Sequence, residues 1–222
     1  MILNVYKPTG ISTYDVIRGI KRGIRPLQVK IGHAGTLDPF AEGVVLVLVG
    51  DSTKRSSELM ALRKTYRGTI ELGAATASAD PDTQCQETSP LPAGLSIEDA
   101  QGYADTFIGR IMQTPPVYSA LRIGGRRSYE LARKGTPIVP EPREVDVYSL
   151  MIVAYEPPLM EFVADVGKGT YLRSLAVDLA RAMGTVGHLR RLRRERIGPY
   201  ASDAAVTIEQ AAALIKAGAS KL

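Results

Sequence analysis

The residues best suited to chemistry gather in one segment, 32–43, which reads Gly-His-Ala-Gly-Thr-Leu-Asp-Pro-Phe-Ala-Glu-Gly. Its glycines permit positive φ angles and close approach of the backbone to a neighbour. Pro39 restricts Asp38 to an extended conformation, so the carboxylate stands on a stiff piece of loop. The residue types alone leave two interpretations open, a presented catalytic carboxylate or an ordinary tight turn.

Two other chemistries of this segment are disfavoured. It contains neither a lysine-bearing phosphate loop nor a Gly-x-Gly-x-x-Gly spacing, so no nucleotide cofactor is indicated. Asp38 and Glu42 could form the acid/base pair of a glycosidase, but nothing in the sequence brings them together. The chain also contains no tryptophan to bind a sugar.

Composition limits the class of protein. The 222 residues are 45% hydrophobic and 23% charged, which is typical of a globular chain. Cys85, His33 and His188 are too few for a disulfide framework or a Cys/His zinc site, so we expect no metal. No apolar stretch is long enough for a membrane span, and the first residues lack a signal-peptide pattern, which predicts a cytoplasmic protein without membrane contact.

The charge balance favours a polyanionic partner. The net charge is +5, the pI is about 9.3, and 19 Arg stand beside 9 Lys. Arginine suits bidentate contacts to phosphate and stacking on bases, although a genomic preference for arginine would give the same count.

The elements that must position Asp38 follow from periodicity and capping. The expected helices, three of which open with a capping box, are 12–23, 96–108, 172–183 and 207–215. The expected strands are 44–49, 66–72, 116–123, 144–155 and 160–166. The run 44–49 is apolar throughout and predicts a strand buried on both faces, directly after the Asp38 segment. Tyr66 lies on the inward side of its strand.

The remaining segments connect these elements. The Pro-rich stretches 74–95 and 136–143 are expected to be surface loops, with Gly124-Gly125 as a turn. No linker is long enough to separate independent domains, so residues 1–222 are predicted to form a single mixed α/β catalytic domain.

Six motifs, in order, resemble the TruB family of tRNA pseudouridine synthases over nearly the whole chain. They are Lys7-Pro8-Thr9-Gly10 with Ser12 and Asp15; Gly32–Pro39 with Ala41–Val44; Lys64-x-Tyr66-Arg67; Gln113-x-Pro115-Pro116-x-Tyr118-Ser119-Ala120; Gly169–Ser174; and His188-Leu189-x-x-Leu192-Arg193-Arg194. The chain departs from the family at Tyr6, where the family usually has Asp, which concerns a local contact. The usual C-terminal RNA-binding domain of the PUA type is expected to be absent.

The resemblance implies a pseudouridine synthase fold, a central mixed and largely antiparallel sheet flanked by helices. It implies isomerisation of uridine 55 in the T arm of tRNA by an enzyme without cofactor or metal. We expect a monomer that binds the tRNA T-arm stem-loop without an obligatory protein partner. A basic insertion around residues 115–145 would grip the T loop.

The resemblance also implies the roles of individual residues. Asp38 would be the catalytic nucleophile, Arg173 would lie against it, and Tyr66 would stack on the target uracil and take part in proton transfer. From the residues alone, Tyr66 could instead be a core tyrosine, and Arg173 would be read as a surface arginine at the start of a helix. The implied substrate contacts are His33, Tyr66, Tyr171, Leu192, Arg193 and Arg194.

Two basic stretches fit an RNA partner. The segment 190–196 contains five arginines in seven residues, and a second group comprises Arg122, Arg126, Arg127, Arg133 and Lys134. Each could instead be a solvated face. Recognition of RNA would depend on loop shape, phosphates and splayed-out bases, since the A-form major groove is inaccessible.

Two other functions are compatible with these motifs. The first is an RNA-guided pseudouridine synthase subunit of a ribonucleoprotein particle, a relative that shares the Asp-containing motif. The second is a tRNA-folding chaperone or binding module without turnover. The bacterial-type motifs argue against the first and the intact Asp38 against the second.

Overall fold

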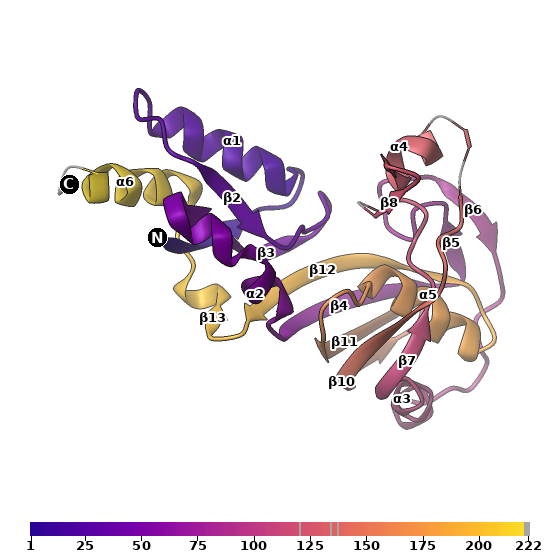
Figure 1. Ribbon diagram of the computed structural model, residues 1–222. Helices are drawn as coiled ribbons and strands as arrows, with labels where there is room; N and C mark the ends of the chain where they lie inside the picture. The colour runs from indigo at the N-terminus through magenta and orange to yellow at the C-terminus, as the bar shows by residue number, and fades with distance from the viewer. Residues whose placement is uncertain (120, 134, 137, 220–222) are drawn as a thin grey trace. The chain divides into compact units, whose positions relative to one another are not determined.

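A computed structural model describes residues 1–119, 121–133, 135–136 and 138–219 and divides the chain into two compact units. Unit 1 comprises Met1–Tyr66 and the described chain from Leu192 onward, and unit 2 comprises Arg67–Arg191. Two strands, β4 (Lys64–Leu72) and β12 (Gly187–Ile197), have residues in both units (Figure 1). That the whole chain acts as one catalytic domain stays a prediction.

Unit 1 is built around β3 (Glu42–Val49). The strands β1 (Ile2–Lys7) and β2 (Ile31–Ala34) pair with it antiparallel, and β12 pairs with it in parallel. Every residue from Gly43 to Val49 is buried. This confirms the strand predicted from the apolar run, because only a strand covered on both faces can be apolar at every position.

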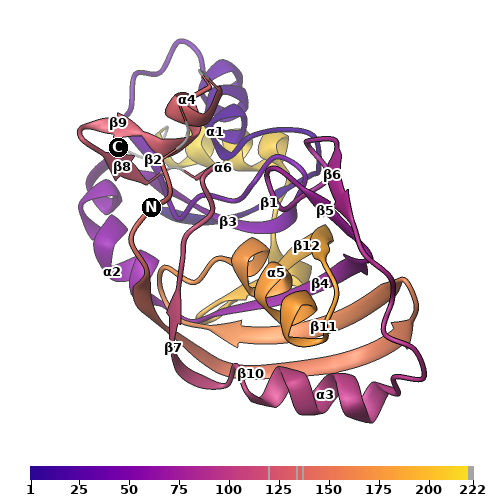
Figure 2. The ribbon, with the colours of Figure 1, turned by 90° about the vertical axis from the view of Figure 1, so that its right-hand side faces the viewer.

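Helices α1 (Thr13–Gly23) and α6 (Ile208–Ala219) pack against each other in unit 1 (Figures 1 and 2). The capping boxes predicted at their N-termini are both formed. A Cβ placed on Gly19 would come within 2.9 Å of Ile208, so glycine allows the close approach. The other elements of unit 1 are η1 (Gly50–Arg55), α2 (Ser56–Ala61), β13 (Tyr200–Ala201) and η2 (Ser202–Ala204).

Unit 2 contains an antiparallel arrangement in which β10 (Arg143–Glu156) pairs with β11 (Leu159–Val166) on one side and with β7 (Gly109–Gln113) on the other. Two helices pack on these strands and their neighbours, α3 (Ile97–Asp105) and α5 (Leu172–Ala182) (Figure 2). Gly187 of β12 lies so close to α5 that a Cβ would meet Ala180 at 2.7 Å. The smaller elements are β5 (Ala74–Thr76), β6 (Cys85–Thr88), β8 (Arg122–Ile123), β9 (Arg126–Arg127) and α4 (Ser128–Arg133).

The predicted strand 116–123 is wrong. Among its described residues only Arg122 and Ile123 are in a strand, and the longer strand of this region, β7, ends at Gln113. Pro115 and Pro116 have no N–H to donate to β10, the partner of the edge strand β7, which is consistent with pairing that ends at Gln113. The turn at Gly124-Gly125 is confirmed, because both residues have positive φ and connect β8 to β9.

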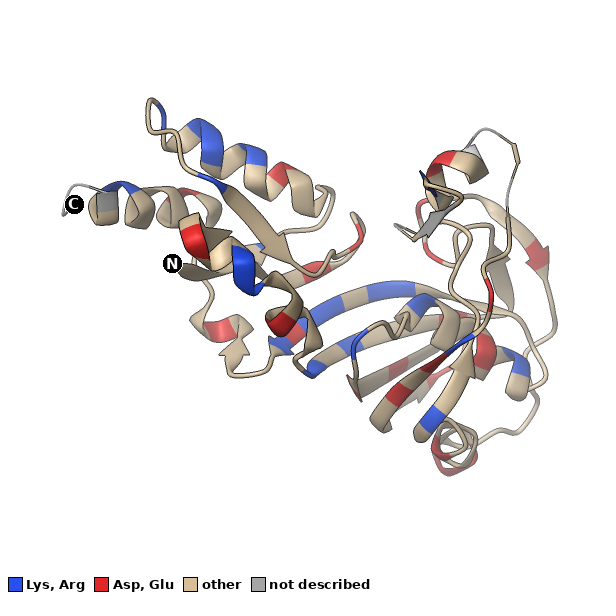
Figure 3. Ribbon diagram, viewed as in Figure 1, with Lys and Arg blue, Asp and Glu red and all other residues tan. Residues whose placement is uncertain are grey.

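Several strands lie where the sequence indicated none, including β1, β2 and β7. The predicted surface loop 74–95 contains the β5–β6 hairpin. The arginine-rich run lies on β12, along which basic residues follow one another in Figure 3. Its charged residues hide the alternation that normally marks a strand.

The fold class is confirmed, since helices flank a mixed sheet whose strand pairs are mostly antiparallel, with β3 and β12 parallel. None of the helices in the described part of the chain has the length and apolar character required to span a membrane.

Candidate active site

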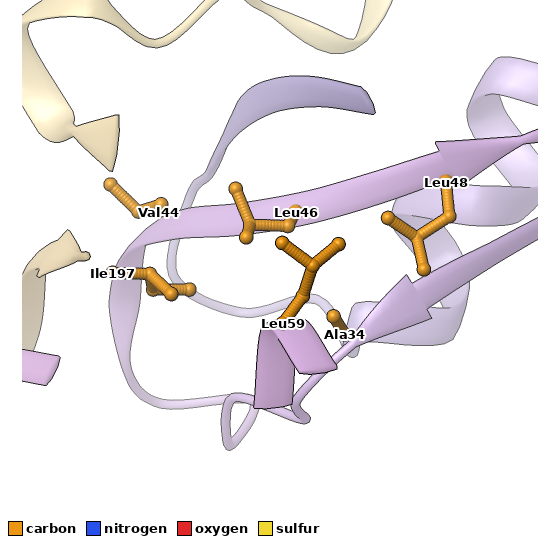
Figure 4. Packing of buried hydrophobic residues seen from close by; sticks show 6 residues of the cluster. All are labelled: Ala34, Val44, Leu46, Leu48, Leu59 and Ile197. Carbon is orange, nitrogen blue, oxygen red and sulfur yellow. The ribbon is translucent and has the colours of Figure 1, made fainter. Parts of the chain in front are cut away.

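Asp38 lies half-buried on the loop that joins β2 to β3, residues 35–41, which we call the Asp38 loop. The strands on either side of this loop are fixed by a buried cluster (Figure 4): Ala34, Val44, Leu46, Leu48, Leu59 and Ile197. The loop therefore starts and ends on rigid backbone, which is the support that a precisely placed carboxylate needs.

Glycines shape both ends of the loop. Gly35 has a φ of +94° and Gly43, just beyond the other end, has a φ of +111°. A Cβ on Gly43 would lie 2.3 Å from the backbone oxygen of Arg194 in β12. Any other residue at position 43 would therefore push β12 away from the loop.

The N-terminal segment braces the middle of the Asp38 loop. The Thr13 hydroxyl accepts a hydrogen bond from the backbone N–H of Leu37 at 2.9 Å and donates one to the Leu37 carbonyl at 3.0 Å. On the other side of Asp38, the Pro39 carbonyl accepts from the Gly10 N–H at 2.9 Å and from Lys7 Nζ at 3.3 Å. The backbone is thus held immediately before and after the carboxylate.

Arg194 contacts both ends of the same loop. The residue is only 1% exposed, and its side chain donates hydrogen bonds to the carbonyls of Val44 (2.7 Å), Thr36 (3.2 Å) and Gly35 (3.3 Å). A fourth bond, at 3.4 Å, goes to the Tyr66 hydroxyl. Tyr66 is 7% exposed at the start of β4, which confirms its predicted inward orientation.

Lys7 is fully buried at the end of β1 beside this loop. Its ammonium group donates to the carbonyls of Pro8, Ile11 and Pro39. Burial lowers the pKa of Lys7 from its ordinary 10.5 to about 8; the charge of Asp38 opposes this shift, and that of Arg194 adds to it.

Lys7 is expected to titrate with a midpoint near pH 8, measurable by carbon-13 NMR of its Cε. Between about pH 8 and 10.5 the unfolded chain holds a proton that the folded chain has released, so the contribution of Lys7 to the free energy of unfolding rises with pH. A Lys7→Met variant should lack this slope. A Lys7 midpoint near 10.5 would contradict the burial described here.

The other substrate residues predicted in unit 1 occupy distinct environments. His33 lies on β2 opposite Val47 of β3, and Leu192 is buried on β12. The Arg193 guanidinium lies over the Tyr6 ring, 5.8 Å from its centroid, and donates to Ser202 at 3.1 Å. Tyr6, the departure from the family pattern, thus stacks with a predicted substrate residue.

Arg173 belongs to unit 2, where it is buried at the start of α5. Its guanidinium forms an ion pair with Asp80 at 3.2 Å, and the two side chains are 4% and 5% exposed. It also donates to the carbonyls of Ser78 and Tyr118, each at 2.8 Å. The alternative of a surface arginine is therefore wrong, and the contact of Arg173 with Asp38 stays a prediction.

The Asp80 carboxyl has further partners. It accepts a hydrogen bond from the Ser78 hydroxyl and another, at 3.0 Å, from the Asp82 N–H. Burial raises the pKa of Asp80, and the Ser78 hydroxyl and the Arg173 charge oppose that rise.

Tyr171 precedes α5 and is held through its backbone. The buried Gln113 side chain accepts from its N–H at 2.8 Å and donates to its carbonyl at 3.1 Å. The Arg143 guanidinium lies over the Tyr171 ring at 5.0 Å. Gln113 thus fixes the turn from which Arg173 enters the helix.

Sequence reasoning gave no role to Lys7, Asp80 or Gln113. Lys7 and Gln113 stand in motifs that carry the resemblance, so their positions offered a signal, whereas Asp80 was assigned only to a surface loop. Within the residues that the structure describes, no three His, Cys, Asp or Glu side chains converge in a way that could bind a metal ion.

The arginine-rich run divides between buried and exposed positions. Arg190 forms an ion pair with Glu71, and Arg194 is buried, whereas Arg191 and Arg196 are exposed. In the second basic stretch, Arg122, Arg126, Arg127 and Arg133 lie on the β8–β9 hairpin and α4. Lys134 and Ala120 lie outside the described residues.

Comparison with known proteins identifies the family. Residues 22–172 match the model of the TruB family pseudouridylate synthase N-terminal domain, and residues 173–221 match the tRNA pseudouridylate synthase B C-terminal domain. The tRNA pseudouridine synthase B of Geobacter sulfurreducens is 39% identical over 96% of this chain and 69% of its own length. The enzyme of that name from Aquifex aeolicus is 37% identical over 94% and 72%.

Solved structures agree with this assignment. A chain in the crystal structure of a Cbf5-Nop10-Gar1 complex is 26% identical with a TM-score of 0.70, over 93% of this chain and 51% of that one. A chain in an H/ACA RNP bound to a substrate RNA has the same fold, with a TM-score of 0.69 at 23% identity, over 99% and 55%. This chain spans about half the length of both. It belongs to the TruB family of pseudouridylate synthases, as its motifs predicted.

Proposed function

We propose that the chain converts uridine 55 in the T loop of tRNA to pseudouridine, with Asp38 as the nucleophile. The observation that carries the proposal is the fixation of the backbone around Asp38. Thr13 holds Leu37, and Gly10 and Lys7 hold Pro39. A half-buried carboxylate on so rigid a support does not have to be ordered when the substrate arrives.

The reaction breaks the N1–C1′ bond, rotates the uracil and joins C5 to C1′. The proton on C5 leaves and N1 gains one, so atoms and electrons balance without an oxidant, a reductant or an energy source. Asp38 acts at the base or the sugar, and Tyr66 stacks on the uracil. Leu192, buried on the neighbouring strand, forms an apolar wall of the base pocket.

Arg173 would keep Asp38 ionised, because a cation near a carboxylate favours its charged form. His33, Tyr171 and Arg193 would contact the flipped nucleotide. The insertion around residues 115–145 would hold the T loop through its backbone and splayed-out bases. We further propose that the enzyme is cytoplasmic and works as a monomer, without an obligatory protein partner, metal or cofactor.

The direct test uses the purified chain and a T-arm hairpin tritiated at C5 of its uridines. Formation of the C5–C1′ bond releases tritium to water, so catalytic release without metal, nucleotide or other proteins is expected. A second hairpin, in which cytidine replaces the target uridine, should release none at that position. Binding of the hairpin without release would identify a binding module or chaperone.

An RNA-guided subunit is the second candidate, favoured by the similarity to a chain of the Cbf5-Nop10-Gar1 complex. The higher identity to tRNA pseudouridine synthase B, 39% against 26%, favours the stand-alone enzyme. Tritium release that requires a guide RNA and added proteins would reverse this choice.

Binding of tRNA is expected to be strongly salt-dependent because phosphate contacts release counterions. Raising salt from 50 to 200 mM should weaken the affinity by about tenfold or more. Replacing both Arg191 and Arg196 with Gln should flatten the dependence, since these exposed residues of β12 are available to phosphates. Fluorescence anisotropy with a labelled hairpin measures both effects, and an affinity insensitive to salt would contradict them.

A further inference from the structure

Arg194 differs from the other arginines of its run. The residue is 1% exposed, and the hydrogen bonds described above all go to neutral oxygens of unit 1. Removing a charged group from water is unfavourable unless hydrogen bonds satisfy it. A surface role in gripping RNA does not explain such burial.

The positions of the acceptors show what the side chain connects. Gly35 and Thr36 open the Asp38 loop, whereas Val44 follows its other end. The backbone of Arg194 adds to this connection, because it pairs with Gly43 in the parallel register of β12 and β3. Side chain and backbone of one residue therefore close the base of the loop.

The fourth hydrogen bond links the loop to a second predicted active-site residue. The Tyr66 hydroxyl accepts from Nη1 of Arg194, and the same nitrogen donates to Thr36. The position of the Tyr66 hydroxyl is therefore coupled to that of Thr36, which lies just after β2 where the Asp38 loop begins.

We propose that Arg194 is a positioning residue whose guanidinium fixes the Asp38 loop and the Tyr66 phenol relative to each other. This inference rests on the proposed function of Asp38. It replaces the direct substrate contact implied for Arg194 by the resemblance. The geometry requires an arginine. Its planar, forked guanidinium can donate hydrogen bonds in several fixed directions at once, whereas a lysine ammonium is a single point of charge.

The test compares Arg194→Lys, which keeps the charge but loses the fork, with Arg55→Lys as a matched control. Arg55 is an exposed arginine of unit 1 that pairs with Glu58. With tRNA pre-bound, Arg194→Lys should lower the single-turnover rate by about 100-fold, because small misplacements of reacting groups have effects of this size. The affinity of Arg194→Lys for tRNA should match that of the unmodified protein. The single-turnover rate of Arg55→Lys should match that of the unmodified protein as well.

Two kinetic outcomes would overturn the proposal. A normal single-turnover rate in Arg194→Lys would show that the fork is not required. A normal rate at saturation combined with weakened tRNA binding would make Arg194 a contact to RNA. If the unmodified protein itself releases no tritium, the proposed function fails instead, so the two failures can be distinguished.

A second measurement does not depend on the variant folding. Nitrogen-15 NMR of the unmodified protein should show separate, slowly exchanging Nη signals for Arg194, because its bonds to the loop and to Tyr66 prevent rotation about Cζ–Nε. Tyr66→Phe should shift the Nη1 signal selectively. Averaged Nη signals, as for a freely rotating guanidinium, would contradict the proposal even if every variant unfolded.

Discussion

Replacing Asp38 with asparagine is expected to lower the rate of pseudouridine formation by about 10⁴-fold or more, the scale seen when a catalytic nucleophile is removed. The amide has nearly the shape of the carboxylate but cannot act as an anionic nucleophile. The hydrogen bonds from Thr13, Gly10, Lys7 and Arg194 to this part of the chain all involve backbone atoms, so the change leaves these partners in place. The affinity for tRNA should therefore stay within a few-fold of the original.

The measurement is tritium release under single-turnover conditions, with hairpin binding followed in parallel. Asp51→Asn is a suitable control, since Asp51 is an exposed acid of unit 1 whose side chain pairs with Lys54. Retained turnover in Asp38→Asn would eliminate Asp38 as the nucleophile. Loss of binding equal to the loss of turnover would assign Asp38 to recognition.

Replacing Arg173 with methionine is expected to have the largest effect on stability, lowering the free energy of unfolding by about 3–5 kcal/mol. The reason is that the Asp80 carboxylate would stay buried without its cation, although the bonds from Ser78 and Asp82 would remain. The double variant Arg173→Met/Asp80→Leu should recover much of this loss, because no buried charge is then left unpaired. Urea unfolding of the three proteins measures the difference.

The double variant distinguishes two roles of Arg173, a structural one as the partner of Asp80 and a proposed catalytic one beside Asp38. If Arg173 also keeps Asp38 ionised, the double variant should regain stability but not turnover, while tRNA binding is little affected. Arg181→Met, at an exposed position on the same helix, controls for the change of side chain. Recovery of turnover together with stability would confine Arg173 to a structural role, and a larger loss of binding than of turnover would make it a contact to RNA.

Local signals explain which parts of the fold could be predicted. The capping boxes of α1 and α6 form between residues three apart, so their chemistry is present in the sequence itself. The same holds for β3, whose apolar run admits few alternatives, and for the Asp38 segment with its glycines and proline. The family motifs implied roles for individual residues, which periodicity cannot indicate, and those roles stay predictions.

The features that the sequence did not predict depend on contacts between residues that are far apart in the chain. Arg194 resembles its charged neighbours on β12, and its burial is explained by acceptors far away in the chain, the carbonyls of Gly35, Thr36 and Val44 and the Tyr66 hydroxyl. Asp80 stands in a polar, Pro-rich stretch typical of a surface loop, yet its partner is Arg173 in α5. Nothing in either local sequence marks these pairings.

Unit 1 is assembled from segments at opposite ends of the chain, whereas unit 2 is one continuous stretch. During synthesis on the ribosome, the residues of unit 2 are therefore complete before unit 1 has received Arg194 or α6. The Asp38 loop emerges early, but it can form its hydrogen bonds with Arg194 only after β12 has left the exit tunnel. A nascent chain arrested before β12 would contain Asp38 but not Arg194, which fixes the Asp38 loop. The ability to catalyse the reaction would therefore arise late in translation.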